Sequence, residues 1–235
     1  MTKIRTLAAS FAVLLACVIT LSASAAETSG RRNGTHTVRY EVTITNLTPG
    51  QQFTPILLAT HDASVKLFTL GQPASTQLGT LATTGNPAPL ADLLNSTPGV
   101  REVVTGDGFT NPGSSITFDI DAGFFDRLSV AAMLIPTNAA FFALNGVELP
   151  FFGYERDVTL YSPAYDSGTE QEDELCKDIP GPFFAECGGP GGGGQPGGGD
   201  GFVHVSSGIH GVGDFTPALR DWRNPVAKIV IKRVR

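Results

Sequence analysis

The segment YDSGTEQEDELC, residues 165–176, holds the densest group of side chains in the chain that could do chemistry. Five acids fall within nine residues: Asp166, Glu170, Glu172, Asp173 and Glu174. Calcium takes about six to eight oxygen ligands, which closely spaced carboxylates, hydroxyls and carbonyls can supply. The segment is therefore either a calcium-binding loop or a solvated acidic loop.

Two of the five acids are better positioned than the others. Asp166 follows the strand candidate 156–162, and Gly168 permits a backbone bend that lets Glu170 fold back. The run 172–174 has no such support and is expected to face solvent, because like charges repel one another. The segment also lacks the fixed ligand spacing of an EF-hand loop, so both alternatives stay open.

Enzymatic chemistry finds little support in the sequence. There is no G-x-S-x-G motif for a nucleophilic serine. The chain has four histidines, none in a zinc-binding spacing: His36, His61, His204 and His210. His61 is expected to cap a turn or to make a core hydrogen bond. A metal-dependent hydrolase would have to use the remaining candidates together: Asp166, Glu170, His204 and His210. It is kept as the alternative to a non-enzymatic protein.

The first 25 residues predict an exported protein. Lys3 and Arg5 precede an apolar run that ends in small residues, which is typical of a signal peptide cleaved near Ala25. Cys17 loosely resembles a lipidation site, which leaves a surface lipoprotein as a further alternative. Cys176 and Cys187 are expected to form a disulfide, since an exported chain meets an oxidising compartment. The localisation expected is secreted, periplasmic or cell-surface.

Charge argues against a nucleic-acid partner, and hydropathy argues against a membrane-spanning helix in the mature chain. The net charge is −6, and removal of a leader with two basic residues and no acid brings it to about −8. Nucleic acid is not an expected partner of so acidic a chain. No apolar run after the leader reaches the roughly 18 residues that a membrane-spanning helix needs.

Hydrophobic periodicity predicts an all-β fold. Apolar residues alternate with polar ones in VRYEVTITN, residues 38–46, which is the pattern of a half-buried strand. Six further strand candidates follow: 53–61, 114–122, 127–136, 156–162, 201–207 and 226–234. Short helices are expected at 75–85 and 89–97. Strands without regular crossover helices predict an antiparallel β-sandwich of about eight strands with short helices in its connections.

The domain boundaries follow from this pattern. Residues 26–37 are expected to be a flexible segment, and residues 38–235 one sandwich domain. The tract 188–201 contains ten glycines and is predicted to be a flexible loop within that domain.

Adjacent phenylalanines offer a second kind of site. Four pairs occur: Phe124-Phe125, Phe141-Phe142, Phe151-Phe152 and Phe183-Phe184. Neighbouring side chains on a strand point to opposite faces, so one member of a pair can lie outside the core. Phe183 and Phe184 are the preferred candidates for a surface that contacts an extracellular protein, a glycan or a membrane.

Three long segments together resemble the spondin domain family. They are ATHDASVKLFTLGQPAS at 59–75, LSVAAMLIPTNAAFFALNGVELP at 128–150 and GFVHVSSGIHGVGDFTPALRDWRNPVAKIVI at 201–231. The resemblance, to the amino-terminal domain of F-spondin, covers roughly residues 38–234 and fits a bacterial-type exported member. It implies an antiparallel β-sandwich and, as in animal members, bound calcium and a role in adhesion or matrix contact.

The resemblance also implies which residues hold the metal. YDSGTE is similar to a family pattern close to Y-D-A-G-T-D, which points to Asp166 and Glu170. The family often carries an aspartate at the position of Ala139 and an acid at that of Asn145. Asn138 and Asn145 can offer only amide oxygens, so calcium affinity is expected to be low. The sequence thus predicts an exported, non-enzymatic binding or adhesion module with a candidate calcium site.

Overall fold

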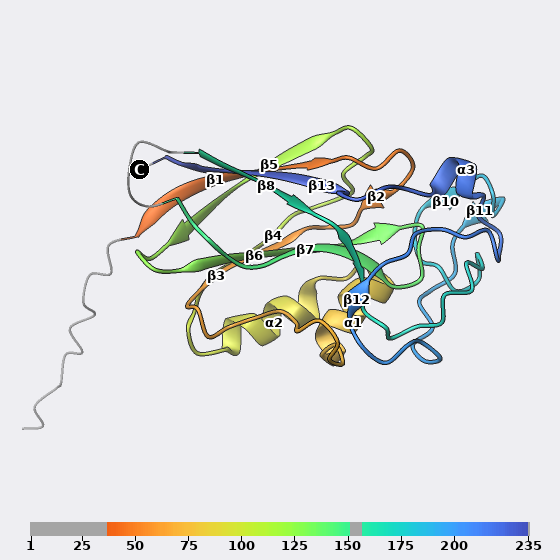
Figure 1. Ribbon diagram of the computed structural model, residues 1–235, viewed down its shortest axis with the longest axis horizontal. Helices are drawn as coiled ribbons and strands as arrows, with labels where there is room; N and C mark the ends of the chain where they lie inside the picture. The colour runs from red at the N-terminus through yellow and green to blue at the C-terminus, as the bar shows by residue number, and fades with distance from the viewer. Residues whose placement is uncertain (1–36, 151–156, 235) are drawn as a thin grey trace, which may run out of the picture. The chain divides into compact units, whose positions relative to one another are not determined.

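Two antiparallel sheets face each other in the computed structural model, which describes residues 37–150 and 157–234 (Figure 1). These residues lie within one compact unit, 35–235. The predicted signal peptide 1–25, the lipidation alternative at Cys17 and nearly all of the segment 26–37 fall outside the described residues. No helix in the described ranges is long and apolar enough to cross a membrane.

The first sheet has four strands in the order β5, β1, β13, β8. Their bounds are Ser115–Ala122, Val38–Asn46, Ala227–Arg233 and Asp157–Ser162. Along β1, the buried residues Tyr40, Val42 and Ile44 alternate with more exposed polar ones. This alternation fixes the register, because a shift by one residue would turn the apolar side chains to solvent.

The second sheet packs on the first and carries the acidic loop at one edge. Its main path is β12 (His204–Val205), β9 (Ala164–Asp166), β7 (Ala140–Glu148), β6 (Arg127–Ile135), β3 (Leu57–His61) and β4 (Val100–Thr105). β2 (Gln52–Phe53) also pairs with β6. A separate two-stranded ribbon joins β10 (Phe183–Phe184) to β11 (Gly189–Pro190).

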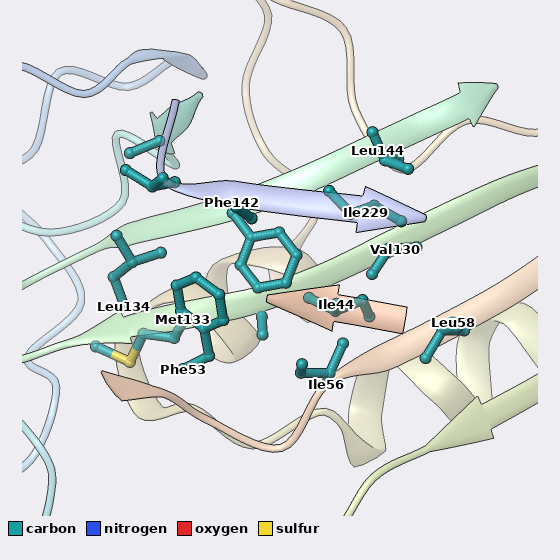
Figure 2. Packing of buried hydrophobic residues seen from close by; sticks show 14 of the residues in the cluster. Ile44, Phe53, Ile56, Leu58, Val130, Met133, Leu134, Phe142, Leu144 and Ile229 are labelled. Carbon is teal, nitrogen blue, oxygen red and sulfur yellow. The ribbon is translucent and has the colours of Figure 1, made fainter. Parts of the chain in front are cut away.

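The main core lies between the two sheets. Phe53 and Phe142 pack with ring centroids 4.4 Å apart, beside Ile44, Val130 and Ile229 (Figure 2). All five side chains are fully buried. Burial of side chains of this size stabilises the fold by about 1.5–3 kcal/mol each.

Two helices form a third layer on the other face of the second sheet (Figure 1). α1 (Thr76–Thr84) begins after Ser75, whose Oγ accepts the Leu78 N–H at 3.2 Å, and ends at Gly85 in a left-handed conformation. α2 (Ala88–Ser96) follows at once. A short third helix, α3 (Pro217–Arg220), lies elsewhere, near the β10–β11 ribbon. Both predicted helices and the all-β sandwich are confirmed.

Five described strands overlap none of the predicted ones: β4, β7, β9, β10 and β11. β7 has no polar alternation because both of its faces are covered. Phe142 enters the core between the sheets, whereas Phe141 packs under the helices, and both are fully buried. A strand covered on both sides lacks the period of two on which the prediction relied.

The other aromatic pairs differ among themselves. Phe183 is 66% exposed while Phe184 is buried, as expected for adjacent residues on a strand. Phe124 and Phe125 are both exposed, Phe125 by 84%. Phe151 and Phe152 lie outside the described residues. Phe184 belongs to the core, so the prediction of a contact surface now rests on Phe183 alone within its pair.

Candidate functional site

Asp166 ends a short strand held between two others. It is the Cα partner of Ala140 on β7 and of His204 on β12. Its Oδ1 accepts the Gly168 N–H at 2.6 Å, which closes a tight turn. Gly168 has φ +67, and a Cβ there would collide with the backbone of Phe202. The predicted bend at Gly168 is present, and Asp166 is buried beneath it.

Glu170 is one of two glutamates in this loop with a buried oxygen that has no hydrogen-bond partner among the described residues. The residue is only 2% exposed. Its Oε1 accepts the Gln195 N–H at 2.9 Å and lies 3.5 Å from Asn138 Nδ2. Its Oε2 has no hydrogen-bond partner among the described residues. Burial, reinforced by the nearby carboxylates of Asp178 and Asp173, raises the pKa of Glu170 from 4.5 to about 7.

Glu172 is the second such carboxylate, and its Oε1 is likewise buried without a described partner. Burial and then the adjacent carboxylate of Asp166 raise the pKa of Glu172 to about 9. When two carboxyl groups are in contact, ionising both is unfavourable because the two negative charges repel, unless a cation between them offsets the repulsion. The expectation that this residue faces solvent is wrong.

Glu174 was also expected to face solvent, and that expectation is wrong for a different reason. Its side chain is buried, and its two oxygens accept the backbone N–H groups of His210, Gly211 and Val212 at 2.5–3.0 Å. Every oxygen is thus engaged. Glu174 anchors the loop that leads to α3 and is not free to hold a metal.

Asn138 organises the acidic loop. Its Oδ1 accepts the Glu174 N–H at 3.0 Å, and its Nδ2 donates to Asp173 Oδ1 at 3.0 Å. The predicted amide-oxygen ligand is therefore already used by the backbone, although the side chain lies beside Glu170. The buried methyl of Ala139 adds no charge next to it.

Asn145 is not brought to the acidic loop. Its Oδ1 accepts the Leu67 N–H and its Nδ2 donates to Phe68 O, each at 2.8 Å. Both ends of the amide thus fasten the loop that precedes α1. His61 makes the expected core hydrogen bond, with its Nε2 2.8 Å from Ser129 Oγ.

The two histidines of the hydrolase alternative occupy different surroundings. His204 Nε2 lies 3.0 Å from Asp200 Oδ2 at the edge of the sheet, and the His210 side chain is exposed. Within the described ranges, no three histidine, cysteine or acidic side chains form a ready-made metal centre. The described residues thus show no metal centre of the kind that the hydrolase alternative requires.

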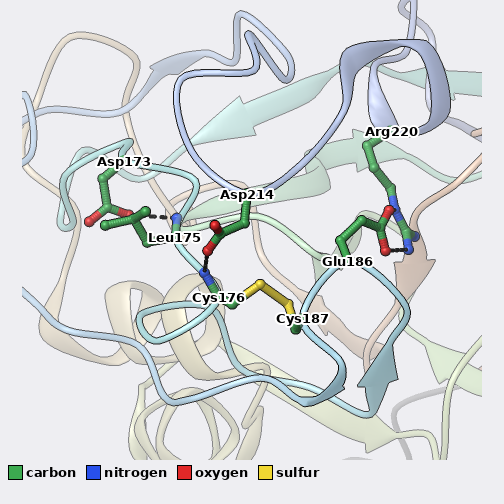
Figure 3. Close-up of a disulfide and its surroundings, with 7 residues drawn as sticks. All are labelled: Asp173, Leu175, Cys176, Glu186, Cys187, Asp214 and Arg220. Carbon is green, nitrogen blue, oxygen red and sulfur yellow. Dashed lines mark hydrogen bonds and ion pairs between the residues drawn. A yellow bond between two sulfur atoms is a disulfide. The ribbon is translucent and has the colours of Figure 1, made fainter.

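The disulfide predicted from the sequence is present and lies next to the acidic loop. Cys176 and Cys187 are joined with an S–S distance of 2.00 Å. Asp214 Oδ2 accepts the Cys176 N–H at 2.8 Å, and Arg220 binds Glu186 through two hydrogen bonds (Figure 3). The disulfide and this ion pair fix both ends of the segment between the two cysteines.

The glycine-rich tract 188–201 lines the acidic loop. The Gly192 N–H donates to Cys176 O at 2.8 Å, and the Gly197 N–H donates to Thr169 O at 2.7 Å. Between these bonds, the Gln195 N–H reaches Glu170. Flexibility of the tract stays a prediction, but the structure gives it specific backbone contacts.

The donor chemistry of this site fits a hard cation. Asp166, Glu170 and Glu172 offer carboxylate oxygens, and two of these oxygens are buried without partners. Calcium prefers such ligands, and water can complete its shell. The ligands are not yet assembled into a full set, so a bound ion would have to draw them together. No signal in the sequence marked Glu172, which lies at the centre of a tight turn closed by the Asp173 N–H and the Gln171 carbonyl at 3.0 Å.

Comparison with known proteins agrees with this architecture. The family model described as Spondin_N matches residues 33–173. The match ends within the acidic loop, after Asp166, Glu170 and Glu172. No curated protein matches the chain.

Proposed function

Since the chain belongs to the Spondin_N family, we propose that it is an exported, non-enzymatic binding module whose acidic loop holds one calcium ion. The family is one of extracellular domains and is not a known enzyme family. The disulfide of Cys176 and Cys187 is consistent with export. In this proposal the module binds another macromolecule outside the cell, and calcium stabilises the loops at one end of the sandwich.

One observation carries the calcium assignment. Glu170 Oε2 and Glu172 Oε1 are buried without hydrogen-bond partners among the described residues. An unsatisfied buried polar group costs about 1–3 kcal/mol, and more when it is charged. A divalent cation placed between Glu172 and Asp166, with Glu170 beside them, would satisfy these oxygens and allow Glu170 and Glu172 to ionise.

Calcium titration calorimetry on the exported chain tests the proposal. We expect a binding heat in the wild type that Glu172→Gln or Asp166→Asn abolishes, because each change removes one charge from the site. Asp92→Asn alters an exposed acid on α2 and should leave the heat unchanged. Binding that is equal in all four proteins would place the ion elsewhere, and no binding in any of them would reject the calcium assignment.

A further inference from the structure

The strand β8 forms one edge of the four-stranded sheet, and its outer side is open. It pairs with β13 over residues 157–162, without a register shift. Among the described residues, the backbone of 157–161 makes no hydrogen bond beyond this pairing. The N–H and C=O groups that point away from β13 are therefore available to another strand.

The opposite edge of the same sheet, β5, is protected. The Asp121 N–H donates to Glu102 Oε2 at 2.5 Å, and the Asp121 carbonyl accepts the Thr60 hydroxyl at 2.7 Å. Glu102 and Thr60 belong to β4 and β3, so side chains of the second sheet cover this edge. β5 also carries the exposed charge of Asp119 within the strand. The interior of β8, residues 158–161, has no charge, no proline and no bulge to discourage pairing.

The sequence of β8, DVTLYS, is complementary to itself. When two copies align antiparallel about Thr159, the two Thr159 side chains face each other, Asp157 faces Tyr161, and Val158 faces Leu160. Directly opposed residues share one face of a sheet, so the polar pairs lie together on the exposed face and the apolar pairs on the half-buried face. No like charges are opposed, and the Tyr161 hydroxyl can donate to the carboxylate of Asp157.

The apolar pairs of this alignment adjoin a pocket between the two sheets. The pocket has a volume of about 600 Å³, and its lining includes Val147 and Leu149 besides Val158 and Leu160. Phe125, which is 84% exposed, also lines it. In a single copy the half-buried Val158 and Leu160 meet water on their outer side. A second copy would cover them with the same two residues, which removes apolar surface from water.

We propose that two copies of this chain pair through β8, antiparallel and centred on Thr159, so that their four-stranded sheets join into one continuous sheet. The interface uses the same surface on both copies, so the assembly closes as a dimer. Main-chain hydrogen bonds between the two edges supply affinity, and the side-chain pairs fix the register. This pairing does not depend on the proposed function or on calcium.

Sedimentation equilibrium of the exported chain tests the proposal at about 1–200 µM, the range in which small interfaces associate. We expect the wild type to approach the mass of a dimer. Thr159→Lys and Thr159→Glu each place two like charges opposite each other, and each should weaken dimerisation about tenfold or more. Thr117→Lys, at an exposed threonine of β5, is the matched control and should dimerise as the wild type does.

An equal mixture of Thr159→Lys and Thr159→Glu decides the register. Pairing about Thr159 brings opposite charges face to face in the mixed dimer, so the dimer mass should return although each variant alone is monomeric. A wild type that stays monomeric at the highest concentration would overturn the proposal, and so would a Thr159→Lys variant that dimerises like the control. A mixture that stays monomeric would show that the strands do not pair about Thr159.

Discussion

Replacement of Glu170 by Gln should make the stability of the cation-free protein less dependent on pH. The amide can still accept the Gln195 N–H, but it cannot ionise. Burial raises the pKa of the wild-type carboxyl from 4.5 to about 7. Between these values the folded chain binds more protons than the unfolded chain, so the free energy of unfolding falls as pH rises.

The magnitude follows from the same shift. Each pKa unit corresponds to about 1.4 kcal/mol, so ionisation of Glu170 costs the folded wild type about 3 kcal/mol above pH 7. Below pH 4.5 the cost vanishes, because the carboxyl is protonated in both states. The stability difference, variant minus wild type, should therefore rise by about 3 kcal/mol between pH 4.5 and pH 8.

Urea unfolding in the presence of a chelator measures this difference. Trp222 is the only tryptophan and is buried, so its fluorescence reports global unfolding. Asp92→Asn serves as the control at an exposed acid. Parallel pH curves for Glu170→Gln and wild type would refute the reasoning. Calcium at about one hundred times its Kd should add about 2.7 kcal/mol to the wild type at pH 8 and less at pH 5, where protons compete.

Three further predictions concern stability. Asn138→Ala leaves the buried Glu174 backbone N–H without its partner, while Asp173 Oδ1 keeps the Leu175 N–H. It should lower the free energy of unfolding by about 1–3 kcal/mol in urea titrations, whereas the exposed Asn95→Ala should change it by less than about 0.5 kcal/mol. Replacing Cys176 and Cys187 together by Ser should cost about 3 kcal/mol, measured as a lower urea midpoint, and a cost near zero would mean that the ion pairs alone hold this loop. Phe142→Ala should cost about 3–5 kcal/mol by the same method, and a loss below 1 kcal/mol would contradict the packing described here.

The predictable strands are those with one buried face and one solvent-exposed face. β1 was predicted with its observed bounds because its polar residues alternate with Tyr40, Val42 and Ile44. β7 was missed because Phe141 and Phe142 are buried in different cores. One of these two cores forms under helices α1 and α2, which come from another part of the chain. The nine residues of β7 therefore carry no sign that both of its faces are covered.

The acidic loop was only half predictable, for a related reason. The turn at Gly168 follows from the glycine, and Asp166 was placed correctly after the strand candidate 156–162, whereas β9, which buries Asp166, was not predicted. The partners of Glu174 lie 36 to 38 residues further along the chain, and those of Asn138 lie 35 and 36 residues away. From the sequence alone, a run of like charges is expected to be solvated. The backbone N–H groups that bind Glu174 could not be recognised because they lie far away along the chain. The disulfide was predictable because only two cysteines follow the leader.

The glycine tract has a consequence for how this chain can vary. A Cβ at Gly192 would collide with the carbonyl of Lys177, and one at Gly199 would collide with that of Gly168, whereas Gly189 and Gly193 have open space around them and a φ outside the left-handed region. An insertion between Gly192 and Gly199 would shift the Gln195 N–H away from Glu170. Substitutions should thus be tolerated at some glycines and rejected at others, and changes of length should be rejected throughout. The glycines of this tract look equivalent in the sequence, but each has different surroundings in the fold.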